Sequence, residues 1–223
     1  MVMAGPLNPN WIVHHAGDML VLNKPTGLLS QPGLGPDLAD SLMSRVQLHW
    51  PQARLVHRLD RDTSGLLLVA LSRELHRALS RLFAERQVVK RYVADVCGVP
   101  TGLEGRIELP IAKFQHRPPL YRVDQAGKSC ITSWRQVAVS PFGQGSSLYS
   151  RLELKPLTGR SHQLRVHLQA IGHPIVGDPL YGVQGVGSSD RLHLHASGLD
   201  LRHPLSGQLM VFEAAVPFQL PTR

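Results

Sequence analysis

The sequence predicts an α+β fold built on a largely antiparallel mixed sheet that is flanked by helices and loops. Strand-like segments outnumber helix-like ones, and many joins between strands are short enough for hairpins. A doubly wound parallel sheet would need more crossover helices. With 223 residues, 43% of them hydrophobic and 18% charged, the chain can bury a large core, and we expect a single domain over residues 1–223.

The N-terminal region is predicted to contain two strands and one helix. The strands are "WIVHH" and "DMLVLNKP", and a loop rich in proline and glycine follows them. Apolar residues then recur every four positions from Leu38 to Val46, which predicts a helix with Asp37 as its cap and its end before Pro51.

Charge is concentrated in "LVHRLDRDTSGLLLVA", residues 55–70. The pattern predicts a strand, a polar turn at residues 62–65 and a second, wholly apolar strand. Because alternate residues of a strand point to the same side, Arg58 and Asp60 are expected to project together at the end of the first strand, where a cleft would begin. Asp62 is suited to bonding its own backbone in the turn.

A helix and a strand are predicted next. Ser72 is the expected cap of a helix in "RELHRALSRLFAER", which carries one apolar stripe. The segment "VVKRYVADVCG" then has the alternation of a strand, with Lys90, Tyr92 and Ala94 on one face. Residues 100–130 are less regular.

The C-terminal part is predicted to contain further strands and one helix. "KSCITSWRQVAV" and "SLYSRLELKP" are strand-like, and "TGRSHQLRVHLQAIGHP" is helix-like, with Ser161 as its cap and Gly172 as its stop. The tail from Asp190 onward is expected to form a closing hairpin.

The charge balance favours a polyanionic partner. Lysine and arginine outnumber the acidic residues by 24 to 16, which gives a formal net charge of +8 and a sequence pI near 10.1. Cys97 and Cys130 have no paired spacing, which favours buried, reduced thiols and a cytoplasmic location. The N-terminus is not leader-like and no apolar run approaches the ~18 residues of a membrane span, so no membrane partner is expected.

Several common site types are disfavoured by the pattern. Asp60 and Asp62 are near neighbours that seldom converge on one substrate, so a paired-acid hydrolase is not expected. His193 and His195 share a strand face, but two ligands are too few for a metal site, and no metal is expected. Neither a "GxSxG" elbow nor a phosphate-cradling loop is present. An acid, arginines, a tyrosine and a basic loop remain, which fit an RNA-binding surface in general.

The segment "LVHRLDRDTSGLLLVA" closely resembles the signature of the RluA family of pseudouridine synthases. Three further blocks match that family in order: "VLNKPTGLLSQPG", "KRYVADV" and "LKPLTGRSHQLRVHLQAIGHPIVGDPLYG". Together with "RLHLHA" they span nearly the whole chain. The resemblance implies the pseudouridine synthase catalytic fold with a central active-site cleft.

The same resemblance implies roles for individual residues. Asp60 is the catalytic aspartate, Tyr92 stacks on the target base, and Arg165 is the basic residue that pairs with the aspartate. Arg160 competes with Arg165 for that last role. Arg58 resembles the arginine that fills the space left by the flipped nucleotide.

The basic segments "KFQHRPPLYR" and "AGKSC" resemble the loop region that grips RNA in this family. Their cations are suited to phosphate groups, and Arg160 of "TGRSHQ" is also expected to bind RNA, whereas the role of Arg61 is open between a contact with RNA and exposure to solvent. The expected phosphate-binding side chains are those of Lys113, Arg117, Arg122, Lys128 and Arg160.

The reaction implied by the resemblance breaks the N1–C1′ bond of uridine, turns the uracil and joins C5 to C1′. All of this happens inside one nucleotide, so no cofactor is expected. Asp60 would act as an ionised carboxylate, either as nucleophile or as base, and a nearby arginine would favour that form.

The blocks leave no room for an N-terminal S4-type RNA-binding domain, so target choice would rest on the catalytic domain. The "LKPLTGRSHQLRVH" block and the chain length are most similar to the dual-specificity subgroup, which modifies 23S rRNA and the tRNA anticodon stem-loop. A tRNA-only or rRNA-only enzyme and a non-catalytic RNA-binding protein are the alternatives. A monomer is expected.

Overall fold

The computed structural model describes residues 4–116, 119–141, 148–182 and 189–220, and its architecture is α+β as predicted. The chain divides into two compact units. The first comprises Met1–Val89 and Ala196–Ala215, and the second comprises Lys90–His195 and Val216–Arg223. None of the helices in the described residues is long and apolar enough to cross a membrane.

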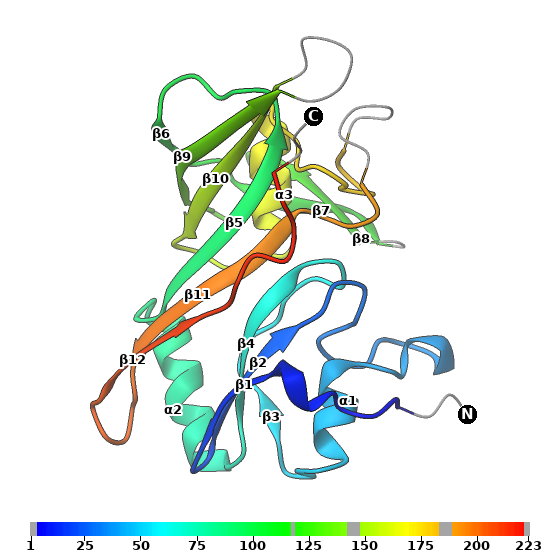
Figure 1. Cartoon of the computed structure of the whole chain (residues 1–223), viewed down its shortest axis with the longest axis vertical. Coiled ribbons are helices and arrows are strands. Elements are labelled where there is room, and N and C mark those ends of the chain that lie inside the picture. Colours follow the sequence, from blue (N-terminus) through cyan, green and yellow to red (C-terminus); the bar gives the residue numbers. More distant parts are fainter. Residues whose placement is uncertain (1–3, 117–118, 142–147, 183–188, 221–223) are drawn as a thin grey trace. The chain divides into compact units, whose positions relative to one another are not determined.

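The first unit is a sheet with helices packed on it (Figure 1). β1, β2 and β4 pair in that order as antiparallel neighbours, β3 pairs with β4, and β11 pairs with β12. The strands are β1 (Ile12–Ala16), β2 (Met19–Lys24), β3 (Arg54–Leu55), β4 (Ser64–Ala70), β11 (Leu194–Arg202) and β12 (Leu209–Glu213). The helices are η1 (Pro9–Trp11), η2 (Pro36–Leu38), α1 (Leu42–Gln47) and α2 (Arg73–Ala84).

The core of this unit follows from the apolar run in β4. All seven of its residues are buried, because a strand covered on both faces has no solvent side to supply with polar residues. Leu66 and Leu68 pack with Leu75 and Leu79 of α2. At Gly65 the φ angle is +114°, and an added Cβ would lie 2.3 Å from the Ala196 carbonyl oxygen, so only glycine fits where β4 begins.

Two predictions for this unit are wrong in detail. Ser41, not Asp37, caps the first helix, because Ser41 and Ser44 bond each other's backbone N–H in a capping box, and Leu38 lies in the separate turn η2. The predicted strand over residues 55–60 ends at Leu55, so the strand-face argument for Arg58 and Asp60 does not hold. Ser72 is the cap of α2, as predicted.

The second unit contains a four-stranded sheet, a two-stranded hairpin and one helix. β5, β10, β9 and β6 lie side by side in antiparallel pairs, and β7 pairs with β8. The elements are β5 (Val89–Cys97), β6 (Glu104–Ile107), β7 (Ile111–His116), β8 (Pro119–Val123), β9 (Thr132–Pro141), β10 (Leu148–Pro156) and α3 (Gln163–Ala170). Three short strands thus lie in the region that the sequence pattern left irregular.

The first six residues of α3, Gln163 to Leu168, are buried, and Leu164 and Leu168 pack against Leu152 and Leu154 of β10. Figure 1 shows α3, in yellow, beside the sheet of this unit. The sequence predicted Ser161 as the cap of α3, and this prediction is wrong. The N-cap is His162, which has a left-handed φ of 54° and no capping side-chain bond. The stop at Gly172 is confirmed, with φ at +84°.

Candidate active site

Asp60 lies in an irregular segment between β3 and β4, and it is half-buried. Leu59, the preceding residue, is buried, whereas Arg58 and Arg61 on either side are exposed. The segment is therefore fixed by one apolar side chain while its charges remain accessible. A segment that belongs to no strand can place one carboxylate outside the pleat of the sheet.

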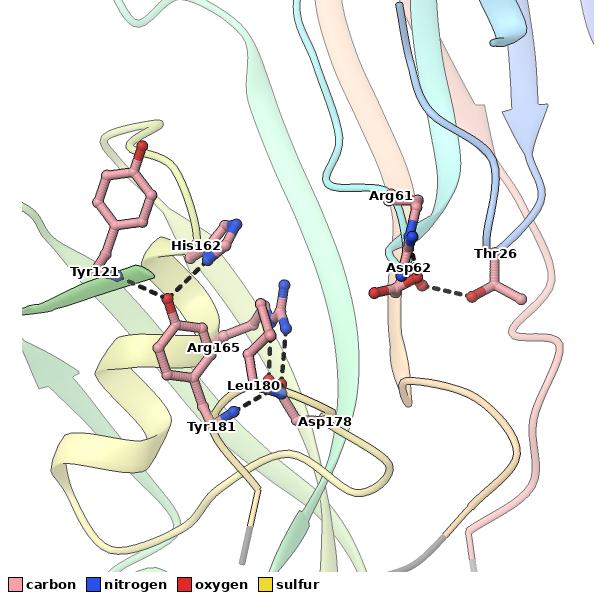
Figure 2. Close-up of polar contacts among 9 residues, drawn as sticks. All are labelled: Thr26, Arg61, Asp62, Tyr121, His162, Arg165, Asp178, Leu180 and Tyr181. Carbon is pink, nitrogen blue, oxygen red and sulfur yellow. Dashed lines mark hydrogen bonds and ion pairs between the residues drawn. The ribbon is translucent and has the colours of Figure 1, made fainter. Parts of the chain in front are cut away.

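The Asp62 side chain and backbone have separate partners. Its carboxylate accepts a hydrogen bond from Arg61 Nε at 3.1 Å, and its carbonyl oxygen accepts one from Thr26 Oγ1 at 2.7 Å (Figure 2). Asp62 therefore has a structural part in the turn, through its neighbour's side chain and through the loop that follows β2. Arg61 is exposed and weakly held by this contact, which leaves it able to reach a ligand.

Tyr92 lies in β5 opposite Leu154 of β10, and it is half-buried against the core of the second unit. The predicted strand is confirmed, but burial does not alternate along it, since the consecutive residues Ala94 and Asp95 are both fully buried. Lys90 donates from Nζ to the Thr158 carbonyl oxygen at 3.0 Å. Tyr92 therefore has its backbone held in the sheet and its ring only partly covered by the core.

Arg165 is the most constrained of the predicted site residues. Its side chain is 2% exposed, and its Nε and Nη2 atoms donate to the two carboxylate oxygens of Asp178 at 2.8 and 2.7 Å (Figure 2). Its guanidinium carbon also lies 5.1 Å from the centre of the Tyr181 ring. This bidentate geometry fixes both the position and the plane of the guanidinium.

The structure thus adds Asp178 and Tyr181 to the residues that the sequence indicated. Asp178 also accepts hydrogen bonds from the backbone N–H groups of Leu180 and Tyr181, at 2.9 and 3.0 Å. Both residues lie in "GDPLYG", at the end of the block that contains Arg165. Their place in this block was the signal in the sequence that could have indicated them as site residues. Periodicity cannot reveal such a pair, because the arginine is in a helix and the aspartate is in a loop.

Tyr181 links the start of α3 to the β7–β8 hairpin. Its hydroxyl oxygen accepts from the Tyr121 backbone N–H at 3.0 Å and lies 2.7 Å from Nδ1 of His162 (Figure 2). The same side chain therefore contacts the buried arginine and holds β8 in place.

Arg160 differs from Arg165 in burial. Arg160 is exposed, and its backbone N–H donates to Oε1 of Gln163 at 3.0 Å, just before α3 begins. An exposed side chain of this kind suits a phosphate contact, whereas the buried, preset guanidinium of Arg165 suits a fixed electrostatic role.

The predicted phosphate-binding residues of the hairpin region are exposed. Lys113 lies in β7, Arg122 lies in β8, and Lys128 follows the hairpin, while Arg117 lies outside the described residues. The Arg122 guanidinium carbon is 5.5 Å from the centre of the half-exposed Phe114 ring, so the hairpin presents both positive charge and an aromatic face.

His167 is a structural residue of α3. It is fully buried, its Nδ1 lies 2.9 Å from Thr132 Oγ1, and its Nε2 lies 2.9 Å from the Leu109 carbonyl oxygen. Burial lowers the pKa of the His167 imidazole below its ordinary value of 6.5. Within the described parts of the chain, no three His, Cys, Asp or Glu residues are grouped so that they could hold a metal ion.

Comparison with known proteins decides the family. The model of the RNA pseudouridylate synthase family matches residues 18–170, which include Asp60, Tyr92 and Arg165. The chain belongs to this family. It is an RNA pseudouridine synthase and therefore an isomerase.

Relatives of this synthase support the same conclusion over nearly the whole chain. It is 43% identical to the dual-specificity RNA pseudouridine synthase RluA of Escherichia coli O6:H1, over 96% of each chain. It is 42% identical to the enzyme of the same name from Salmonella typhimurium, over 96% of this chain and 97% of that one.

Two solved structures resemble this synthase. Human RNA pseudouridylate synthase domain containing 1 has a TM-score of 0.79 and 32% identity, over 93% of this chain and 84% of that one. Human RNA pseudouridylate synthase domain containing 4 has a TM-score of 0.70 and 25% identity, over 93% and 89%. The predicted pseudouridine synthase fold is thereby confirmed.

Proposed function

We propose that this synthase converts uridine to pseudouridine in both 23S rRNA and the tRNA anticodon stem-loop. The observation that carries this proposal is the 42–43% identity, over 96% of the chain, to enzymes named as dual-specificity. Such similarity covers the described basic hairpin as well as the candidate catalytic residues, so it bears on target choice as well as on chemistry. The catalytic domain is proposed to extend over residues 1–223.

Asp60 is proposed as the catalytic carboxylate. The N1–C1′ bond breaks, the detached uracil turns, C5 bonds to C1′, the C5 proton leaves and N1 takes up a proton, so the composition of the nucleotide is unchanged. The carboxylate acts at the ribose as nucleophile or as base, and both routes require its ionised form. The half-buried position of Asp60 between exposed arginines is consistent with a carboxylate that a nucleotide can reach.

Tyr92 and Arg165 are proposed to serve the same nucleotide. The ring of Tyr92 would stack on the extruded uracil, and its phenol would assist loss of the C5 proton. Arg165 would supply a positive charge that favours the ionised aspartate. The bond to Asp178 supports this role, because a preset guanidinium needs no reorganisation during the reaction.

Arg58 is proposed to occupy the space of the flipped nucleotide. Lys113, Arg117, Arg122, Lys128, Arg160 and Arg61 are proposed to bind phosphate groups. Arg117 lies outside the described residues. The others are all exposed, and so is Arg58. We also propose that the synthase acts as a monomer, which light scattering tests, and that it acts in the cytoplasm, which cell fractionation tests.

Mapping of pseudouridines in a strain that lacks the gene tests the target. We expect losses at one or more uridines of 23S rRNA and at one uridine of a tRNA anticodon stem-loop, and the purified protein should restore both in vitro. Loss in only one RNA class would show a single-target enzyme. Unchanged pseudouridine in all RNA, with retained RNA binding, would show a non-catalytic protein and overturn the proposal.

A further inference from the structure

The last residue of β2 and the loop that follows it hold the backbone of the Asp60 segment through three side chains. Ser30 Oγ donates to the Leu59 carbonyl oxygen at 2.7 Å and accepts from the Leu59 backbone N–H at 3.1 Å. Thr26 Oγ1 donates to the Asp62 carbonyl oxygen at 2.7 Å. Lys24 Nζ donates to the Arg61 carbonyl oxygen at 2.8 Å. The bonded groups therefore lie on both sides of Asp60 along the chain.

These bonds replace those that a neighbouring strand would supply. Residues 56–63 form no named strand, so their backbone groups need other partners wherever they are buried. The Ser30 hydroxyl bonds both backbone groups of Leu59, as a paired strand would, and Ser30 and Leu59 are only 4% and 8% exposed. Water cannot readily take over such a bond when the hydroxyl is removed.

Lys24 ties the loop to itself and to the Asp60 segment. Its side chain is fully buried, and Nζ also donates to the carbonyl oxygens of Pro25 and Leu28, at 2.8 and 2.7 Å. An ammonium group has three donors, and here each of the three bonds is made to a carbonyl. Burial of a charge is costly unless it is bonded in this way, so the lysine fixes the loop that carries Thr26 and Ser30.

We propose that Ser30 and Thr26 are positioning residues for the reaction: they fix the backbone on the two sides of Asp60 and so set the direction of its carboxylate. They act through Leu59 and Asp62 and are not proposed to touch the reacting atoms. The proposal rests on the proposed function of Asp60. Its physical basis is that a carboxylate displaced by a fraction of an ångström loses its alignment with the ribose, although the substrate still binds.

The test compares Ser30→Ala, Thr26→Val and Thr26→Ser. Thr26→Val keeps the shape but removes the donor, and Thr26→Ser keeps the donor. Ser72→Ala is the control, because it removes a comparable bond, from the Leu75 N–H to Ser72 Oγ at 3.2 Å, at the start of α2 in the same unit. The readouts are the thermal midpoint, the Kd for substrate RNA and the single-turnover rate of pseudouridine formation.

We expect Ser30→Ala and Thr26→Val to lower the single-turnover rate by about tenfold or more, with Kd within about twofold of the wild type. Thr26→Ser should restore the rate, and Ser72→Ala should keep the wild-type rate despite a lower thermal midpoint. Hydrogen exchange of a peptide covering residues 56–63 should accelerate in Ser30→Ala and not in Ser72→Ala.

The positioning role would be overturned if Ser30→Ala and Thr26→Val had the same single-turnover rate as Ser72→Ala. Ser30 and Thr26 would then have a purely structural role. Failure of the proposed function looks different, because the wild-type protein itself would then form no pseudouridine in any RNA offered. Faster exchange at residues 56–63 with an unchanged rate would likewise contradict the positioning role, since the backbone would have loosened without effect on the chemistry.

Discussion

Arg165 and Asp178 form a bidentate ion pair in the interior of the second unit, with N–O distances of 2.8 and 2.7 Å and side-chain exposures of 2% and 0%. The direction of the proposed catalytic arginine is therefore set by a residue in the loop beyond α3. Buried ion pairs are costly to break from one side, because the remaining charge has neither water nor a partner.

Asp178→Ala is expected to lower the free energy of unfolding by about 3–5 kcal/mol, because it leaves the buried guanidinium of Arg165 without this carboxylate. Urea denaturation measures the change. Glu153→Ala is the matched control in the same unit, since its pair with Arg135 is exposed, and its loss is expected to cost less than about 1 kcal/mol. Equal losses in the two variants would show that Asp178 does not hold the arginine.

Asp60→Ala and Asp60→Asn are expected to abolish pseudouridine formation while the Kd for RNA stays within about threefold, because this one carboxylate is proposed to do the chemistry whereas cations are proposed to supply most of the binding. Product is measured by mass spectrometry of digested RNA, and Kd by filter binding. Asp62→Asn is the control, since Asp62 has a structural part in the same turn. A fully active Asp60→Asn variant would exclude Asp60 as the catalyst.

Tyr92→Ala is expected to weaken substrate binding by about 1–3 kcal/mol, the typical contribution of one stacked base, whereas Tyr92→Phe should leave binding within about twofold. Any loss of single-turnover rate in Tyr92→Phe then measures the part played by the phenol. Binding in Tyr92→Ala as tight as in the wild type would exclude stacking on the target base.

Combined replacement of Lys113, Arg122 and Lys128 by alanine is expected to weaken RNA binding and to lower the slope of log Kd against log salt by about two, since each phosphate contact to a single strand contributes about 0.7. The double variant Arg106→Ala/Arg135→Ala is the control, because both of those exposed arginines lie outside the β7–β8 hairpin, in β6 and β9, and each is paired with a glutamate. An unchanged slope in the triple variant would place RNA binding elsewhere on the molecule.

His167 should make folding sensitive to mild acid. Because burial lowers the pKa of His167 below 6.5, the unfolded chain binds more protons than the folded one as the pH falls through 6.5 toward the lowered value. The contribution of the neutral His167 to stability is therefore fully present above that range of pH and is lost as the pH falls through it. Denaturation at about pH 7.5 and about pH 5.5 should show a smaller acid loss in His167→Gln than in the wild type.

The exposed His49 provides the control for that experiment. His49→Gln should lose as much stability as the wild type between the two pH values, because this variant retains the buried His167. A His167→Gln variant with the wild-type acid loss would assign the pH sensitivity to other groups.

Local patterns in the sequence were enough to predict the α+β class, the strand β5, the cap of α2 at Ser72 and the stop at Gly172. Each of these depends on residues within a few positions of one another, so hydrophobic period and capping chemistry determine them. The family resemblance also named Asp60, Tyr92 and Arg165, which lie in the matched blocks.

Bonds between distant segments decided the rest. The segment after Leu55 leaves strand geometry because side chains of the loop after β2, such as Ser30, supply its backbone hydrogen bonds, and no local period records that. In the same way, Arg165 is fixed by an aspartate in another loop, and Tyr181 meets Tyr121 sixty positions away. The sequence by itself therefore determined the fold class and indicated which residues are proposed to carry the chemistry. Only the tertiary structure decided what holds those residues, because the partner of a polar side chain depends on proximity in space and not on a repeat along the chain.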